Sequence, residues 1–206
     1  VTYMLVDGGT VSVPGAKASN YRLADETLHG TITPKALAVA GLLAPNKEYD
    51  RLLTATVTGT ATVATAGVVG TDAVSVEGTV TGGLFATKDV GTQKPVAISG
   101  LMLTGAQAGN YMLSAAALTA NITAKALTVT GLTAATKEYD GNRTATVSST
   151  NAVFDGIIQG DMLSVTANGL FDTQDAGLNK AVAFSGIALT GTDAKNYALS
   201  TTMAAT

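Results

Sequence analysis

Residues 122–147 read ITAKALTVTGLTAATKEYDGNRTATV, and this stretch has a counterpart earlier in the chain. Residues 32–57, which lie 90 positions earlier, read ITPKALAVAGLLAPNKEYDRLLTATV. Aligned without gaps, the two stretches share 17 identical residues in 26 positions. Agreement of this kind at a fixed offset marks an internal repeat, so the sequence predicts structural units of roughly 90 residues.

An asparagine–tyrosine signature extends the repeat to three units. It occurs three times, with asparagine at Asn20, Asn110 and Asn196 and tyrosine at Tyr21, Tyr111 and Tyr197. We therefore divide the chain into residues 1–34, the C-terminal part of a preceding repeat, residues 35–123, a complete first repeat, and residues 124–206, a second repeat that lacks its last strand. Short linkers around Lys35 and Lys125 are expected to join them.

Local patterns predict strands throughout. Val96 and Ile98 alternate with smaller residues, which is the period of a half-buried strand. No stretch shows the apolar periodicity and end caps of an amphipathic helix. Glycine-containing pairs at residues 82–83 and 168–169 are expected to form turns between strands. The sequence thus predicts an all-β protein.

A glycine also interrupts one strand in each repeat. Apolar residues stand at even-numbered positions up to Ile98 and at odd-numbered positions from Leu101, with Gly100 between them. Gly186 stands at the equivalent position of the second repeat. A change of parity at a glycine predicts a bulge or bend, as where a strand crosses between sheets.

The spacing before the repeated tyrosine favours one architecture. Asp193 precedes Tyr197 by four residues, the spacing of the tyrosine corner in immunoglobulin-like sandwiches. Gln107 and Lys17 replace the acidic residue in the other two copies, so the match is partial. We expect tandem immunoglobulin-like β-sandwiches, with β-grasp-like modules as the alternative.

Composition excludes several functional classes. Charged residues make up 13% of the 206 residues and the net charge is −3, which disfavours a nucleic-acid partner. The chain has no cysteine, so it forms no disulfide and offers no thiolate ligand for a metal. No apolar run approaches the roughly 18 residues that span a bilayer, so we expect no membrane insertion. His29, the single histidine, has no counterpart in the later repeats. We expect no enzymatic activity and no catalytic residue.

Recurrence at fixed spacing assigns structural roles to the tyrosines. Tyr49 and Tyr139 are expected to bury their rings and to hydrogen-bond backbone through their hydroxyls. Tyr21, Tyr111 and Tyr197 are expected to form corners.

Calcium is the one cofactor for which the sequence offers candidate ligands. Loop aspartates supply oxygen atoms, namely Asp50, Asp140, Asp155 and Asp161. They lack an alternating Asp-x-Asp-x-Asp spacing, so we expect no metal or other cofactor and keep calcium as the less favoured alternative. The neighbouring Lys47 and Glu48 are expected to be exposed charges that discourage aggregation of strand edges.

The KEYD motif occupies residues 47–50 and 137–140. This motif and the asparagine–tyrosine motif, taken in this order, resemble the YDG repeat, which occurs beside related MBG repeats in large bacterial surface proteins of the filamentous-haemagglutinin type. The resemblance covers residues 32–206. Tyr139 and Asp140 are followed by the expected glycine, Gly141, whereas Arg51 takes this place in the first repeat. The resemblance implies a secreted or cell-surface array without catalysis.

We therefore expect a structural stalk or spacer of a bacterial adhesin or extracellular fibre, whose partners are the neighbouring repeats. A carbohydrate- or surface-binding module is the first alternative. The second alternative is a filament of identical molecules joined end to end, in which residues 22–33 of one molecule complete the open edge of the next.

Overall fold

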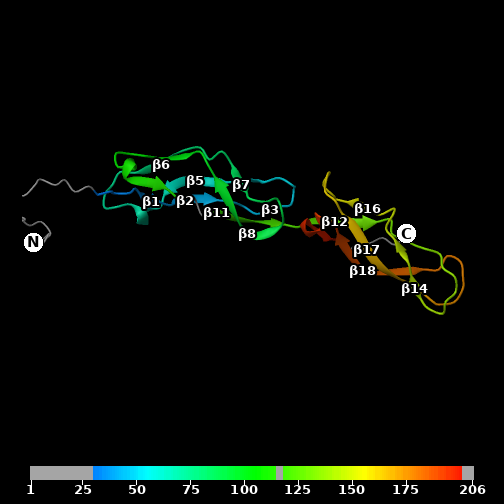
Figure 1. Ribbon diagram of the computed structural model, residues 1–206. Coiled ribbons are helices and arrows are strands. Elements are labelled where there is room, and N and C mark those ends of the chain that lie inside the picture. The colour runs from blue at the N-terminus through cyan, green and yellow to red at the C-terminus, as the bar shows by residue number, and fades with distance from the viewer. Residues whose placement is uncertain (1–29, 115–117, 201–206) are drawn as a thin grey trace, which may run out of the picture. The chain divides into compact units, whose positions relative to one another are not determined.

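The computed structural model describes residues 30–114 and 118–200 (Figure 1). Asn20 and Tyr21 of the first signature lie outside the described residues, as does His29. Within the described residues, secondary structure consists of strands and short 3-10 turns, so the predicted all-β class is confirmed. In that part of the chain, no helix has the length and apolar character needed to cross a bilayer.

The chain divides into two units, residues 1–33 and residues 34–206. Of the first unit, residues 30–33 are described, and they form no regular secondary structure. Both described signatures lie in the second unit.

In the first repeat, the strands and turns are β1 (Lys35–Leu37), β2 (Val39–Leu43), β3 (Lys47–Glu48), β4 (Thr54–Ala55), β5 (Thr58–Val63), η2 (Thr65–Gly67), β6 (Ser75–Gly78), β7 (Gly83–Phe85), β8 (Gly91–Ile98), β9 (Leu101–Thr104), η3 (Ala108–Asn110), β10 (Tyr111–Leu113) and β11 (Leu118–Thr123). In the second repeat, they are β12 (Lys125–Thr130), β13 (Thr133–Ala134), β14 (Thr144–Ala145), β15 (Val147–Ser148), β16 (Val153–Asp155), β17 (Ser164–Phe171), β18 (Val182–Thr190), η4 (Ala194–Asn196) and β19 (Tyr197–Leu199).

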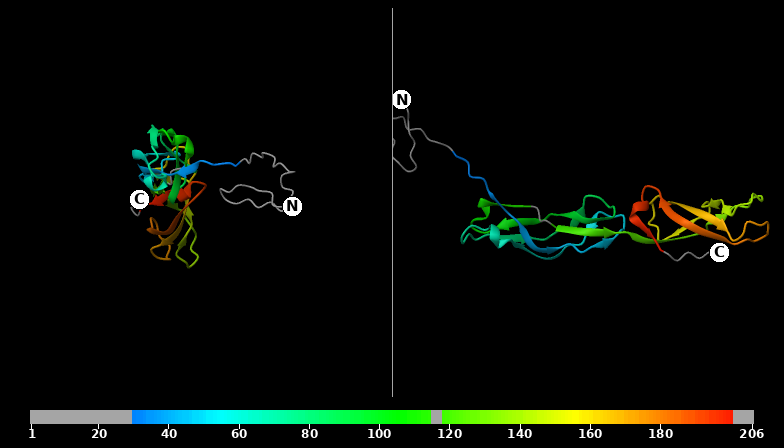
Figure 2. Two further views of the ribbon diagram at one scale, coloured as in Figure 1. Left: turned by 90° about the vertical axis from the view of Figure 1, so that its left-hand side faces the viewer. Right: turned by 90° about the horizontal axis from the view of Figure 1, so that it is seen from below.

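Short strands join into long, kinked segments that pair with their neighbours in chain order. In the first repeat, β2 pairs with β5, β4 with β7, β6 with β9, and β7 with β8, all antiparallel. β11 pairs antiparallel with β8 and parallel with β3, so the last segment returns to the first. Figure 2 shows these strands side by side along a common direction in each repeat. This closed order of pairing leaves few unpaired edges.

The parallel pairing of first and last segments positions the signature tyrosines. Lys35 lies opposite Tyr111 where β1 meets β10, and Lys125 lies opposite Tyr197 where β12 meets β19. The two repeats thus use the same register, and each tyrosine is buried at the start of its strand.

One apolar cluster includes buried residues of both repeats. Tyr49, Phe85 and Ile122 belong to it from the first repeat, and Leu127 and Tyr197 from the second. A single residue, at position 124, separates β11 from β12. The repeats are therefore joined by nearly continuous strand and by shared packing, instead of by the loose connection of a typical linker.

The predicted change of parity at glycine occurs in both repeats. Gly100 separates β8 from β9 with φ of +90°, and a Cβ atom there would lie 2.3 Å from the Thr79 carbonyl oxygen. Gly186, with φ of +59°, lies inside β18, whose pairing with β17 shifts register near Asn168. The strand breaks in the first repeat and only bulges in the second.

The turns expected at residues 82–83 and 168–169 are not both present. Gly83 begins β7, but residues 168–169 lie within β17. A Cβ atom on Gly83 would lie 2.5 Å from Val96, and one on Gly169 would lie 2.8 Å from Val147. Both positions need glycine because side chains of neighbouring strands approach the backbone closely. In a sequence, a glycine needed for such close packing cannot be told from a glycine needed for a turn.

We expect Gly100→Ala to lower the free energy of unfolding by about 1–3 kcal/mol, because alanine is strained at positive φ and its methyl group meets a carbonyl oxygen. Gly109→Ala is the matched control, since a Cβ atom there meets no atom within 4 Å. Urea denaturation of both variants measures the difference, and equal stabilities would contradict this role of Gly100.

Candidate functional site

A hydrogen-bonded corner surrounds the signature tyrosine of the second repeat. The Tyr197 hydroxyl donates to Asp161 Oδ2 at 2.7 Å and accepts the Ile158 amide at 3.0 Å. The Met162 amide donates to Asp193 Oδ2 at 3.1 Å. Burial, together with the bond to Asp161, raises the pKa of Tyr197 to about 12. The phenol therefore stays protonated and ties β19 to the loop before β17.

The first repeat builds the same corner with one substitution. The Tyr111 hydroxyl donates to Asp72 Oδ2 at 2.6 Å and accepts the Val69 amide at 2.9 Å. The bond to Asp72 raises the pKa of Tyr111. Gln107 takes the place of the second carboxylate and accepts the Ala73 amide at 2.9 Å. Bonding to backbone upstream is what a tyrosine corner requires, and here an aspartate completes it.

The aspartate of the corner has a signal of its own in the sequence. Residues 67–76 read GVVGTDAVSV and residues 156–165 read GIIQGDMLSV, an offset of 89. Asp72 and Asp161 occupy the same position of this motif. The sequence-based predictions include Asp161 only as a possible metal ligand and do not include Asp72, so both corner roles are found in the structure alone.

Lys88 of the first repeat reaches the corner of the second. Its ammonium lies 2.8 Å from Asp193 Oδ1 and 3.5 Å from Asp161 Oδ1, and it donates to the Tyr49 hydroxyl at 3.1 Å. The bond from Lys88, followed by that from the Met162 amide, lowers the pKa of Asp193. Bonds to Asp193 and then to Tyr49 raise the pKa of Lys88. The Lys88 ammonium therefore lies between two carboxylates that both have little access to water.

Tyr49 packs directly against the corner tyrosine. The rings of Tyr49 and Tyr197 meet edge to face, with centroids 5.6 Å apart and planes at 75°, an arrangement that aromatic pairs favour. Burial raises the pKa of Tyr49. Its ring is buried as expected, but its hydroxyl bonds Lys88 instead of backbone, because the partner comes from the loop that also contacts the next repeat.

Asn196 completes the junction from the second repeat. Its side chain is fully buried, accepts the Val90 amide at 3.0 Å and donates to Asp89 Oδ1 at 3.2 Å. Lys195 binds the other oxygen of Asp89 at 2.9 Å. Asn110, the equivalent of Asn196 in the first repeat, is exposed. The signature asparagine is thus buried where a neighbouring repeat covers it.

The residue that replaces the expected glycine also contacts the second repeat. Arg51 keeps the left-handed backbone with φ of +69°, and Gly141 at the equivalent position has φ of +73°. The Arg51 guanidinium lies 3.2 Å from Asp161 and donates to the Gln159 carbonyl oxygen at 2.7 Å. Left-handed backbone costs a side-chain-bearing residue about 1–2 kcal/mol, so this contact offsets local strain.

The lysine of the KEYD motif has a different role from the one expected. Lys47 is half-buried and holds the turn together, with bonds to Asp50 at 2.6 Å and to two carbonyl oxygens at 2.9 Å. The Lys137 ammonium binds Asp140 at 2.7 Å in the same way. Glu48 is exposed but accepts a bond from Lys125 of the second repeat at 2.9 Å.

Three of the four candidate calcium ligands form ion pairs with basic side chains, and the fourth is exposed on a strand. Asp50 and Asp140 bind lysines of their own turns, Asp161 faces Arg51 and Lys88, and Asp155 is exposed on β16. In residues 30–114 and 118–200, no group of three or more acidic, histidine or cysteine side chains is placed to hold a metal.

We call the face formed by Tyr49, Arg51 and Lys88 the YDG end of the first repeat. The face formed by Asp161, Asp193, Asn196 and Tyr197 is the corner end of the second repeat. All buried side-chain nitrogen and oxygen atoms among the described residues have hydrogen-bond partners. This interface therefore buries charge without leaving an unpaired polar group, which would be costly.

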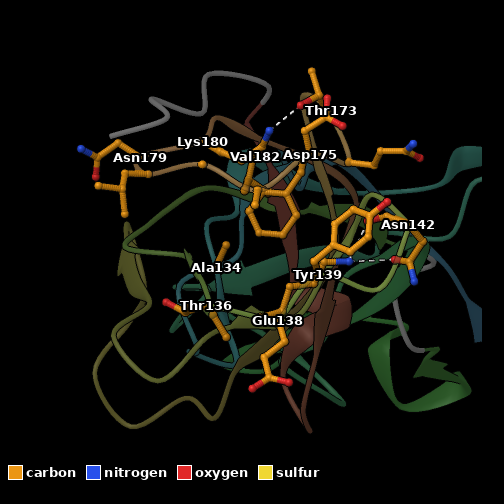
Figure 3. A pocket seen from close by; sticks show the side chains of 17 residues that line it. Ala134, Thr136, Glu138, Tyr139, Asn142, Thr173, Asp175, Asn179, Lys180 and Val182 are labelled. Atoms are coloured by element: carbon orange, nitrogen blue, oxygen red, sulfur yellow. Dashed lines mark hydrogen bonds between the residues drawn. The ribbon is translucent and has the colours of Figure 1, made fainter.

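The YDG end of the second repeat has the same motif but no such cover among the described residues. Tyr139 is 67% exposed, whereas Tyr49 is 1% exposed, so the expectation of a buried ring fails for Tyr139. A hollow of about 490 Å³ lies beside it, lined also by Phe171, Gln174 and Lys180 (Figure 3).

The YDG domain family matches the chain twice, over residues 33–120 and residues 123–205. The chain therefore belongs to the YDG family and contains two domains of it in tandem, as the motifs predicted. Comparison with curated proteins and with solved structures gave no match.

We expect Lys88→Met to lower the free energy of unfolding by about 2 kcal/mol, because Asp193 and Asp161 lose a cation while they remain buried. Gln174→Met changes the equivalent position of the second repeat, where the side chain is exposed, and should change stability by less than about 0.5 kcal/mol. Urea denaturation of both variants is the measurement. Similar losses in the two variants would contradict the assigned role of Lys88.

Acid should weaken the junction through Asp193. Because its pKa is lowered in the folded chain, its stabilising contribution is complete above the unfolded value of about 3.9 and is lost as the pH falls through the lower folded value. Asp193→Asn should therefore show a shallower loss of stability than the unmodified chain between about pH 5 and pH 2. Chemical denaturation across this range checks the prediction, which parallel curves would refute.

Proposed function

We propose that this member of the YDG family is a structural stalk or spacer segment of a secreted or cell-surface bacterial adhesin or extracellular fibre, without catalytic activity. The observation that carries the proposal is the charged and aromatic junction formed by Lys88, Asp161, Asp193, Tyr49 and Tyr197. A spacer needs repeats that resist bending against each other, and a buried, fully paired junction provides this resistance.

The short connection between the repeats supports the same role. A single residue separates β11 from β12, and Lys125 at the start of β12 binds Glu48 of the first repeat. In a tandem array, stability is the sum of the stabilities of the repeats and of the interfaces between neighbours. An array with such interfaces therefore gains both length and stability with each repeat.

For the fold of each repeat we favour an immunoglobulin-like sandwich. The corners at Tyr111 and Tyr197 support it, because each tyrosine hydroxyl accepts a backbone amide upstream. A β-grasp module places a helix against its sheet, whereas residues 30–114 and 118–200 form no α-helix.

Stiffness is testable because the chain has no cysteine. Glu77→Cys and Asp155→Cys, both at exposed positions, place one spin label on each repeat. We expect a narrow distribution of label distances that becomes broad in Lys88→Met, because the variant loses the ammonium that bridges the repeats. A broad distribution in the unmodified junction would overturn the stalk proposal.

A carbohydrate-binding module is the second candidate, because Tyr139 exposes an aromatic ring beside a polar hollow. Aromatic rings of this kind stack on sugars. A glycan array tests it directly: binding that Tyr139→Ala removes would support this candidate over the stalk, and absence of binding would eliminate it. The equivalent residues of the first repeat form the junction, which favours a protein contact at this surface.

A further inference from the structure

The second repeat presents a junction surface that lacks a partner in the described part of the chain. Tyr139, Gly141 and Gln174 occupy the positions that Tyr49, Arg51 and Lys88 occupy at the observed junction. Tyr139 and Gln174 line an open hollow, while their counterparts in the first repeat contact the corner end of another repeat.

The hollow also corresponds to the place of a specific side chain. In the first repeat, Ile122 of β11 lies in register with Lys47 and Gly91 and is 1% exposed. Lys137 and Gly177, the equivalents of these two partners, line the hollow. The hollow of the second repeat therefore lies where an isoleucine on an added strand would take the place that Ile122 takes in the first repeat.

The chain itself carries a second isoleucine of this kind. Ile32 precedes the first repeat as Ile122 precedes the second, and its side chain is 98% exposed. An isoleucine so exposed leaves its apolar surface in water, which burial in a hollow would relieve. The first repeat that follows it also presents a complete corner, with Tyr111 bonded to Asp72 and with Asn110 exposed.

We propose that the YDG end of the second repeat binds another molecule of this chain, head to tail. Ile32 of the incoming molecule enters the hollow as an added strand segment beside Lys137, and its corner end, with Asp72 and Tyr111, packs on Tyr139. Main-chain pairing to an open edge is an established mode of recognition. Because the two surfaces of the contact differ, the contact is heterologous and gives head-to-tail oligomers instead of a symmetric dimer.

Charge predicts that this contact is weaker than the junction within the chain. Asp72 would face Gln174 and Gly141, so neither the ammonium of Lys88 nor the guanidinium of Arg51 has an equivalent. The contact also lacks the covalent connection that gives the internal junction a high effective concentration. Association should therefore depend on concentration and should strengthen when a cation is restored.

Sedimentation velocity of the full chain over a range of concentrations tests the proposal. We expect reversible head-to-tail oligomers that Ile32→Asp and Tyr139→Ala each abolish. Gln174→Lys should tighten association by about 10-fold, since a hydrogen bond to a charged group contributes about 1.5 kcal/mol or more. Asp72→Asn, which keeps a partner for the Tyr111 hydroxyl, should cancel this gain.

Met102→Ser is the matched control, because Met102 is an exposed apolar residue on β9 outside both surfaces, and it should leave association unchanged. A chain that stays monomeric at the highest concentration overturns the proposal, and so does association that is unaffected by Ile32→Asp and Tyr139→Ala. Either result leaves the stalk proposal standing, because that proposal rests on the internal junction and on the label distances.

Discussion

The ammonium group of Lys88, placed between Asp193 and Asp161, is the interaction on which the arrangement of the two repeats depends. Each carboxylate already has a local partner, since Asp161 accepts the Tyr197 hydroxyl and Asp193 accepts a backbone amide. Covering these acids with another repeat removes water that would solvate their charge. Without a cation at this point the cost of burial would oppose the contact, whereas with Lys88 present the same acids hold it together.

Aromatic packing and charge act together at this interface. Tyr49 contacts both Lys88 and Tyr197, so its ring excludes water from the ion pairs while its hydroxyl accepts a bond from the ammonium. Exclusion of water strengthens the attraction between the charges, because the local dielectric constant falls. Arg51 adds a second cation at the cost of a left-handed backbone, so the first repeat departs from the expected glycine at a position where the interface gains from it.

Sequence patterns predicted those features that depend on local chain geometry. The parity change at Gly100 and Gly186 was visible because alternation of side chains is a property of every strand. The turn expected at Gly169 was wrong, since a glycine required for close packing of Val147 looks the same in a sequence as a glycine required for a turn. Asp72 was missed because its motif repeats at an offset of 89 and so does not align with the motifs that repeat at an offset of 90.

The sequence by itself determined that the chain is all-β, that it contains tandem YDG domains, and that tyrosines recur at fixed positions. It determined these things because repetition and alternation are properties of the order of residues along the chain. Only the tertiary structure decided that Tyr49 is buried while Tyr139 is exposed, although both lie in the same KEYD motif. Burial depends on what covers a surface, and the residues that cover Tyr49 come from distant positions in the chain, in the corner of the next repeat.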